Sequence, residues 1–368
     1  MGQPILVTVD PRSFHIYEIV RAERCDQVIW QESFEAILPK ERKREVRTIS
    51  DGAEAIRATA ESSAGGHWWG RDHFHALRPL SRLANQLEER AYYFIDEVEK
   101  MEKRLKKQGS FIQALENDEQ WRAYQQAMEE SILDFDQFSV LFKWLKQALW
   151  WIDPKSGTLR KKEQALEECE EILQLMSEEL RIYEVPRAIL NFQDHLPSIL
   201  HYFDDIPALE KQLANLIDEE FYRQEMILYY HYWFKTFQSS GETKKYYQKQ
   251  ADWCQTFLIE DLGEEAFVGL WQQVRSCFEE IVRASSYVEN INSRLRRFFN
   301  QSRGQLNQNR LNLIRFYLNH KILRRGKRQG ASATQLYNSQ TQPKHWLEVL
   351  REMEEERKET QQLLPIAA

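Results

Sequence analysis

The sequence predicts an α/β domain that is interrupted by a long all-helical insertion, so that the protein is mostly helical overall. Short β-branched runs separated by turns occupy the first fifty residues, which is typical of strands. From residue 80 to 282 the apolar residues follow helical spacing, and glycine is rare. The segment 283–328 is basic, with Glu289 as the only acid among twelve lysines and arginines. The chain thus has an α/β start, a helical middle and a basic helical end.

The first element expected is a β-hairpin over residues 4–19. Residues 5–9 are a β-branched run, and a second run returns from residue 14. The turn between them begins at Asp10 and has proline at its second position, as many turns do. Because Asp10 directly follows a strand, it is a candidate catalytic metal ligand. The alternative is a turn aspartate whose side chain bonds nearby backbone groups.

A helix is expected over residues 27–38. Its apolar residues recur at helical intervals, which would place Val28, Phe34 and Ile37 on one inward face. Such a helix would cover one side of the strands that flank it.

A short strand over residues 46–50 and a helix over 53–59 are expected next. Asp51 ends the strand, and Gly52 after it permits a tight exit. Asp51 is therefore a candidate for a catalytic acid at a strand end. It could equally cap the helix that follows, which aspartate does well.

A glycine-rich turn at 64–66 then leads to Trp68, Trp69 and the stretch from Asp72 to His75. This stretch resembles the Asp/Cys-x-x-His motif that several transposase superfamilies place near the fifth strand, which implies that Asp72 and His75 are possible neighbours of a catalytic site. We do not expect a metal site built from the histidines of this region, because they lack a further partner at a recognisable ligand spacing.

The middle of the chain is expected to be a helical bundle. Breaks fall at Gly109, at 153–157, at 239–241 and at the three prolines Pro186, Pro197 and Pro207. Its many tryptophans and tyrosines are interpreted as core residues rather than as a recognition surface.

The basic segment begins with an amphipathic helix. An apolar stripe of Val288, Ile291, Leu295 and Phe298 runs beside a polar stripe that contains Glu289. A lone carboxylate on a basic, half-buried helix suits a metal ion held against a polyphosphate backbone. The alternative is an ordinary amphipathic surface helix.

Composition narrows the class of protein. The 368 residues suffice for one large domain or two ordinary ones, and the 12 % aromatic content argues against disorder. No apolar run approaches 18 residues, and no secretory signal precedes the first strand. The four cysteines show no paired spacing, so we expect a reduced cytoplasmic protein without structural zinc. The chain as a whole carries a net charge of −7, and its bases cluster at 283–328. An anionic partner is therefore expected to bind at that segment.

Three sequence motifs stand out in the C-terminal part of the chain: VENINSRLR at 288–296, LNLIRFYLNH at 311–320 and HWLEVL at 345–350. Together they resemble the C-terminal part of bacterial insertion-sequence transposases of the DDE type. Family members usually have Ser-Pro where this chain has Ser332-Ala333, a departure that concerns only the tail. The stretches 3–12 and 46–53 are also similar to the family pattern.

The resemblance implies a ribonuclease-H-like mixed-sheet core, interrupted by an all-α insertion between the second and third catalytic acids. The expected boundaries are 1–79 and 283–330 for the core, 80–282 for the insertion and 331–368 for a tail. Asp51 and Glu289 match the second and third acids. The first acid lies about ten residues upstream of the motif at 4–11 in such proteins, so its strand is expected to be missing, as is an N-terminal end-recognition module.

The implied chemistry is cleavage and transfer of DNA strands with Mg²⁺ or Mn²⁺, in which Asp51 and Glu289 hold metal. Water would attack a phosphodiester at an element end, and the released 3′-hydroxyl would attack target DNA. The expected partners are element ends and target duplex, with a homo-oligomer forming on DNA near the nucleoid and no membrane involved. The expected DNA-backbone contacts are Arg294, Arg296, Arg297, Arg303, Arg324, Arg325, Lys327 and Arg328.

Two alternatives stay open at this point. The chain could be a catalytically inactive transposase remnant that still binds DNA, since the first acid is expected to be absent. It could also be a helical interaction scaffold with no role on nucleic acid, in which case the basic face is only solvated.

Overall fold

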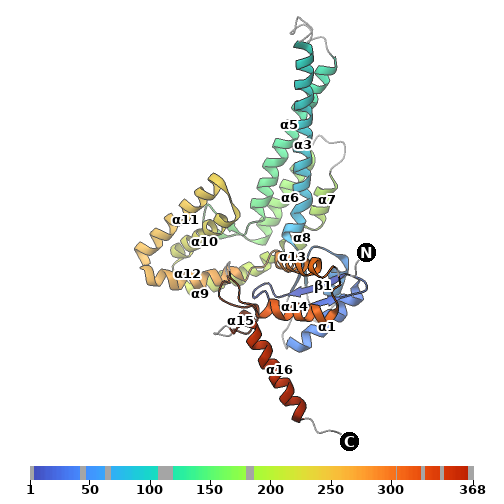
Figure 1. The fold of residues 1–368 in the computed structure, drawn as a ribbon. Coiled ribbons are helices and arrows are strands. Elements are labelled where there is room, and N and C mark those ends of the chain that lie inside the picture. Colours follow the sequence, from blue (N-terminus) through green and yellow to red (C-terminus); the bar gives the residue numbers. More distant parts are fainter. Residues whose placement is uncertain are drawn as a thin grey trace. The chain divides into compact units, whose positions relative to one another are not determined.

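The computed structural model of the chain is mostly helical, with a few short strands (Figure 1). It describes residues 4–41, 47–62, 68–106, 119–179, 186–303, 305–324, 328–339 and 344–363. The expected turn at 64–66, the break at Gly109 and the first residue of the expected strand at 46–50 lie outside this range.

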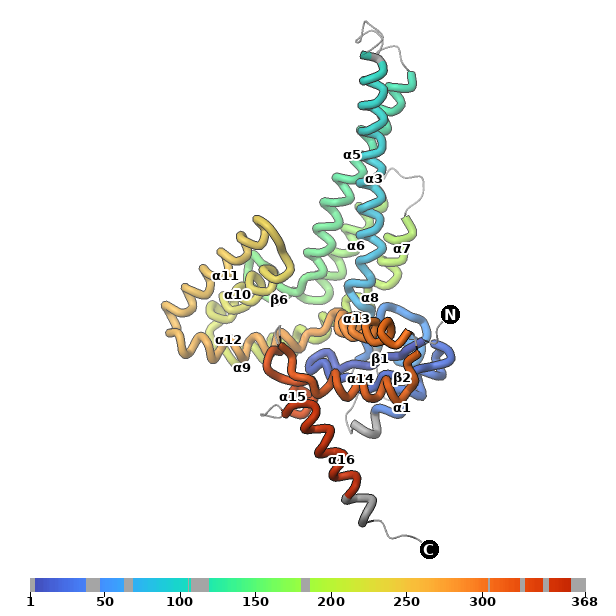
Figure 2. Tube along the Cα trace, viewed as in Figure 1, coloured from blue at the N-terminus to red at the C-terminus, as the bar shows by residue number. Residues whose placement is uncertain are grey.

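The chain divides into two compact units. Figure 2 traces the path of the chain, coloured by residue number. The strand unit consists of Met1–Asp72 and Val282–Ala368, and the helical unit is His73–Ile281. The helical unit begins earlier than the expected boundary at Pro79, because helix α3 (His73–Leu105) already starts at His73 and contains that proline. Apolar packing on both sides of Pro79, from buried Ala76 and Leu80, outweighs the backbone hydrogen bond that proline cannot donate.

The expected N-terminal hairpin is present. Strand β1 (Ile5–Val9) pairs antiparallel with β2 (Ile16–Arg21), and the register shifts by a bulge near Val9. Asp10 begins the connecting turn, where its backbone N–H donates to the carbonyl of His15 at 2.8 Å. The turn alternative for Asp10 therefore describes its position.

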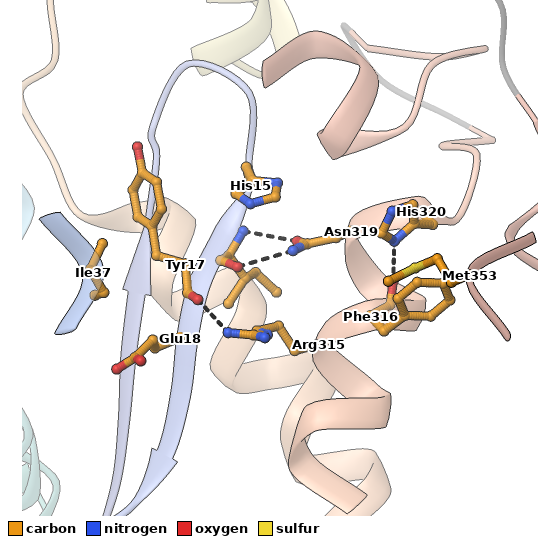
Figure 3. Close-up of a pocket in the computed structure, with 10 residues that line it drawn as sticks. His15, Tyr17, Glu18, Ile37, Arg315, Phe316, Asn319, His320 and Met353 are labelled. Atoms are coloured by element: carbon orange, nitrogen blue, oxygen red, sulfur yellow. Dashed lines mark hydrogen bonds between the residues drawn. The ribbon is translucent and has the colours of Figure 1, made fainter. Parts of the chain in front are cut away.

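Helix α14 (Gln308–His320) covers the outer edge of β2 with polar side chains (Figure 3). The N–H of Ile16 donates to Oδ1 of Asn319 at 2.8 Å, and Nδ2 of Asn319 donates back to the Ile16 carbonyl at 3.0 Å. The Arg315 guanidinium donates to the Tyr17 carbonyl at 2.6 Å. An edge strand presents unpaired backbone groups, and here the helix satisfies them in place of another strand.

Replacing Asn319 with leucine is expected to lower the free energy of unfolding of the strand unit by about 3 kcal/mol, since it leaves a buried N–H and a buried C=O unpaired. Asn319 is itself buried. Urea unfolding with a probe in the strand unit measures the effect. The control is Asn309→Leu on the exposed face of the same helix. Equal effects of the two changes would show that the edge contact contributes nothing.

Apolar packing joins the hairpin to the C-terminal helices α13 (Ser286–Gln301) and α14, although they are distant in sequence. The expected stripe on α13 is largely correct: Ile291 and Leu295 are buried, while Val288 and Phe298 are partly buried against them. The buried members of this cluster are Val7, Ile16, Ile19, Ile291, Leu295, Leu306, Leu311, Ile314 and Leu318.

Helix α1 (Gln27–Glu41) packs on the other side of the hairpin. Phe34 and Ile37 are buried as expected, but Val28 is 62 % exposed and Trp30 takes the inward place. At about 100° per residue, Trp30, Phe34 and Ile37 share one face, whereas Val28 lies well off it. The expectation for Val28 was wrong for this reason.

The second pair of strands is parallel. Strand β3 (Arg47–Ser50) pairs with β4 (Trp68–Arg71), and helix α2 (Glu54–Ser62) forms the crossover between them. In the described part of the chain these strands form their own two-stranded sheet, separate from β1 and β2. The single mixed sheet that the sequence suggested is therefore not observed.

The strand unit ends in two further helices, α15 (Ala333–Asn338) and α16 (Trp346–Leu363). Helix α15 starts with a capping box in which Ser332 and Gln335 satisfy each other's backbone N–H groups. The expected tail from residue 331 is thus helical in its described portions.

The described part of the helical unit consists almost entirely of helices (Figures 1 and 2). A small hairpin of two short strands occupies the expected break at 153–157, and the other described breaks separate helices as expected. The elements after α3 are α5 (Glu119–Ala148), β5 (Ile152–Asp153), β6 (Thr158–Leu159), α6 (Lys162–Glu179), α7 (Arg187–Asp194), α8 (Leu196–Ile199), η2 (Leu200–Asp205), α9 (Ile206–Leu216), α10 (Glu220–Gln238), α11 (Gly241–Leu262) and α12 (Glu264–Glu279).

Aromatic residues supply much of the helical core, as the sequence suggested, with exceptions. Trp150 and Trp151 are buried and stack on each other at 4.3 Å between ring centroids. Trp253 is 62 % exposed, because it lies about 100° around α11 from its buried neighbour Cys254. Trp144 is also exposed. No helix in the described ranges is long and apolar enough to cross a lipid bilayer.

Candidate functional site

Two aspartates stand side by side where the parallel strands end. Ser50 pairs with Arg71 at the carboxyl ends of β3 and β4, and Asp51 and Asp72 follow directly. The Asp72 N–H donates to the Ser50 carbonyl at 2.7 Å, which continues the ladder by one step. Since parallel strands end at the same edge, the residues after them meet there.

The start of α13 is tied to this same edge. Asp72 is fully buried, and its Oδ2 accepts hydrogen bonds from the backbone N–H and the hydroxyl of Ser285. Ser285 is the residue before α13, and the N–H of Glu289 in the first turn reaches its carbonyl at 3.4 Å. One carboxylate thus connects β4 to the helix that carries Glu289.

Asp51 and Glu289 are exposed, in contrast to Asp72. Asp51 Oδ1 accepts a hydrogen bond from the Ala53 N–H at 3.2 Å, which is an Asx-turn contact just before α2 rather than the N-cap contact that the sequence left open. Two exposed carboxylates therefore stand on elements that Asp72 and Ser285 hold together.

Arg71 adds a cation beside Asp51. Burial lowers the pKa of the Arg71 guanidinium, while the charge of Asp51 raises it. Gly52 has φ +94°, and an added Cβ there would stand 3.4 Å from that guanidinium. That distance is an ordinary van der Waals contact, so it is the positive φ that favours glycine at position 52.

Asp10 is engaged in its own turn. Its Oδ2 accepts hydrogen bonds from the Ser13 N–H at 2.8 Å and from the Ser13 hydroxyl. The turn reaches α13 as well, because the Phe14 ring packs edge-on against Tyr287 at 4.7 Å. Asp10 therefore supports the turn that contacts the first turn of α13, and its role as a metal ligand stays a prediction.

His75 lies in the first turn of α3 in the helical unit, whereas Asp72 follows β4 in the strand unit. The place of His75 beside a catalytic site stays a prediction.

The fit of the acids to a metal ion is partial. No group of three or more histidine, cysteine, aspartate or glutamate side chains in the described ranges is arranged to hold a metal ion. Asp51 and Glu289 are oxygen donors of the kind that Mg²⁺ prefers, and Mg²⁺ commonly takes one or two carboxylates together with water and substrate phosphate. These residues would suit Mg²⁺ only when phosphate and water complete its coordination.

Four cations gather on α13 and just after α14. The Arg294 pKa is lowered by burial and by the charge of Arg297. The Lys321 pKa is lowered by burial and then by the charges of Arg294, Arg324 and Arg297. The Lys321 ammonium lies 5.5 Å from the centre of the Tyr317 ring, and that ring contacts Phe298, the residue after Arg297 on α13. We therefore treat Arg294, Arg297, Lys321 and Arg324 as one positive cluster.

The other predicted DNA contacts differ in role. Arg328 donates to the carbonyls of Arg12 and Pro11, and its guanidinium lies 4.3 Å from the centre of the Phe14 ring, so it supports the hairpin turn. Arg296 is exposed and lies seven residues, about two helical turns, after Glu289. Arg303 is exposed just after α13. Arg325 and Lys327 lie outside the described residues.

A cavity of about 280 Å³ lies elsewhere in the strand unit, beside the edge of β2 (Figure 3). His15, Tyr17, Arg315, Phe316 and Met353 are among the side chains that line it. None of the predicted acids lines this cavity. The cavity is therefore distinct from the group of Asp51, Asp72 and Glu289, which we call the strand-end site.

Comparison with protein-family models, with curated proteins and with solved structures found no match for this chain. The assignment of function therefore rests on the residues and their geometry. The sequence did not point to Ser285 or Arg71 as members of the site. A serine just before the amphipathic helix was a capping signal that could have drawn attention to Ser285.

Proposed function

We propose that this chain is a DDE-type transposase of a bacterial insertion sequence, and that the strand unit is a ribonuclease-H-like core that cleaves and transfers DNA strands. Asp51 and Glu289 would be the acids that hold Mg²⁺ or Mn²⁺. The observation that carries the proposal is the Asp72–Ser285 contact, which links the first turn of α13 to the carboxyl edge of β3 and β4. It connects elements on both sides of the 209-residue helical unit His73–Ile281.

The order of the elements supports this proposal. A hairpin, a helix, a strand, a helix and a parallel strand precede the inserted helical unit, and α13 follows it. Asp51 would provide one ligand from a strand end and Glu289 one from the helix. Arg296 lies about 700° from Glu289 around α13, which returns it to the same face, where it would bind a phosphate.

A second candidate is a DNA-binding chain without catalysis. It is favoured by the absence of a three-ligand group in the described part and by the serine contacts that engage Asp10 and Asp72. It predicts salt-dependent DNA binding by the cation cluster, with no strand cleavage at any metal concentration.

Nicking of supercoiled plasmid with Mn²⁺ distinguishes the two candidates. The transposase proposal predicts that wild-type protein nicks DNA, and that Glu289→Gln lowers the nicking rate by at least about a thousandfold, because one charged metal ligand is lost. Duplex binding at low salt should be unchanged in this variant. The matched control is Glu23→Gln, which alters an exposed glutamate of the same unit.

Each outcome has a defined meaning. Nicking that survives Glu289→Gln contradicts the assigned role of Glu289, and parallel loss of nicking and binding makes Glu289 a structural residue. Binding without nicking by the wild-type protein selects the second candidate. Failure of the wild-type protein to bind DNA at low salt excludes both and favours a helical interaction scaffold.

A further inference from the structure

Aromatic rings stand among the four clustered cations of the strand unit. Tyr317, near the end of α14, contacts the Trp346 ring at 5.3 Å and the Phe298 ring at 6.5 Å between centroids. The Lys321 ammonium lies 5.5 Å from the centre of the Tyr317 ring. We call this set the aromatic–cation surface; its members are Arg294, Arg297, Tyr317, Lys321, Arg324 and Trp346.

Helix packing builds this surface. Ile291 and Leu295 of α13 are buried against Ile314 and Leu318 of α14, in one apolar cluster. Arg294 precedes the buried Leu295 by one position. The same packing that buries the leucines therefore brings the cations of two helices together and holds them there.

The ion pairs of the described residues do not include these four cations. Charges of one sign held close together repel, and the protein as a whole is negative. A polyanion that binds here relieves the repulsion.

The ring geometry indicates more than an attraction for phosphate. Tyr317 and Trp346 meet at an interplanar angle of 85°, so their contact uses the edge of one ring and one face of the other. Trp346 is only partly buried and begins α16. Aromatic faces beside cations are the features that bind the unpaired bases and the backbone of a single strand, whereas bases inside a duplex present no face for stacking.

We propose that the aromatic–cation surface binds an unpaired stretch of a DNA strand, with phosphates on the four cations and a base stacked against Trp346. The proposal rests on DNA as the ligand of the proposed function. It adds that this surface receives single-stranded rather than duplex DNA.

The test measures binding of the full chain to a labelled oligothymidine and to a duplex of equal length, by fluorescence anisotropy at several salt concentrations. Trp346→Leu is expected to weaken oligothymidine binding about tenfold while changing duplex binding much less. Trp346→Phe should restore most of the loss. Trp253→Leu, at an exposed tryptophan of the helical unit, is the matched control and should have no effect.

Arg297→Gln tests the cations separately. It is expected to weaken oligothymidine binding and to reduce the slope of log K against log salt by about 0.7, the value for one lost phosphate contact on a single strand. Arg122→Gln on exposed α5 is its control.

The inference is overturned if Trp346→Leu weakens both DNA forms equally, or weakens neither while Arg297→Gln weakens both, because the surface is then a general anion site. Metal-dependent nicking is measured in the same preparations. Nicking that depends on Glu289 together with unchanged single-strand binding in Trp346→Leu would refute this inference and leave the proposed function standing. Single-strand binding that depends on Trp346, without nicking, would support this inference and refute the proposed transposase activity.

Discussion

Replacing Asp72 with alanine is expected to destabilise the strand unit by about 3–5 kcal/mol. Its carboxylate is fully buried and accepts two hydrogen bonds from Ser285. Hydrogen bonds to a charged group contribute about 1.5–3 kcal/mol each, and truncation leaves the serine N–H and hydroxyl without their acceptor. Loss of this contact should release the first turn of α13 from the end of β4.

Hydrogen exchange of the amides in β4 and α13 measures this effect within the strand unit, where a global unfolding curve would mix both units. Asp72→Asn keeps the volume and one acceptor oxygen, so it should cost less than Asp72→Ala. Ser285→Ala removes the hydroxyl but keeps the N–H and should also fall between. Ser286→Ala, at the exposed neighbouring serine, is the control.

A double-mutant cycle gives the sharper result. The combined Asp72→Ala and Ser285→Ala change should cost less than the sum of the single changes, because both remove the same hydrogen bond. Additive costs, or exchange rates in α13 that do not respond to Asp72→Ala, would mean that the contact does not hold the helix in place. The strand-end site would then lose the connection on which it is built.

Local pattern was sufficient to predict elements and faces that the spacing of neighbouring residues encodes. The hairpin followed from two β-branched runs and a proline turn, and the buried face of α13 followed from residue spacing. The predicted inward position of Val28 was wrong because Val28 is apolar like its neighbours but lies on the other side of α1. The predicted boundary at Pro79 differs from the observed one because the packing of α3 overrides the helix-breaking tendency of proline.

Contacts between distant segments could not be foreseen from the sequence. Asp51 and Glu289 were recognisable as lone acids at a strand end and on a basic helix, but Asp72 meets Ser285 across a separation of 213 residues. No periodicity encodes such a pairing. Arg328 was predicted to contact DNA because it is basic, and the structure shows a further role in bonding the backbone of the hairpin turn. Its contact with DNA stays a prediction.

A buried histidine makes the helical unit sensitive to acid. The Trp150 indole N–H donates to Nδ1 of His231 at 2.8 Å, so this nitrogen must be unprotonated. Burial, and then the charge of Lys235, lower the pKa of His231 to about 3. The Lys235 ammonium lies 4.2 Å from the centre of the Trp150 ring, which keeps a positive charge close to the pair.

The stability of the helical unit is therefore expected to fall as the pH is lowered from about 6.5 towards 3. Within this window the unfolded chain binds a proton at His231 that the folded protein does not, so stability is fully present above the ordinary pKa and declines by about 1.4 kcal/mol per pH unit. Urea unfolding followed by tryptophan fluorescence at a series of pH values measures the slope. His231→Gln should flatten it by about one proton, whereas His195→Gln, whose hydrogen bond lies at the surface, should leave it unchanged. If the slope is the same in wild type and in His231→Gln, the protons that destabilise the helical unit bind at residues other than His231.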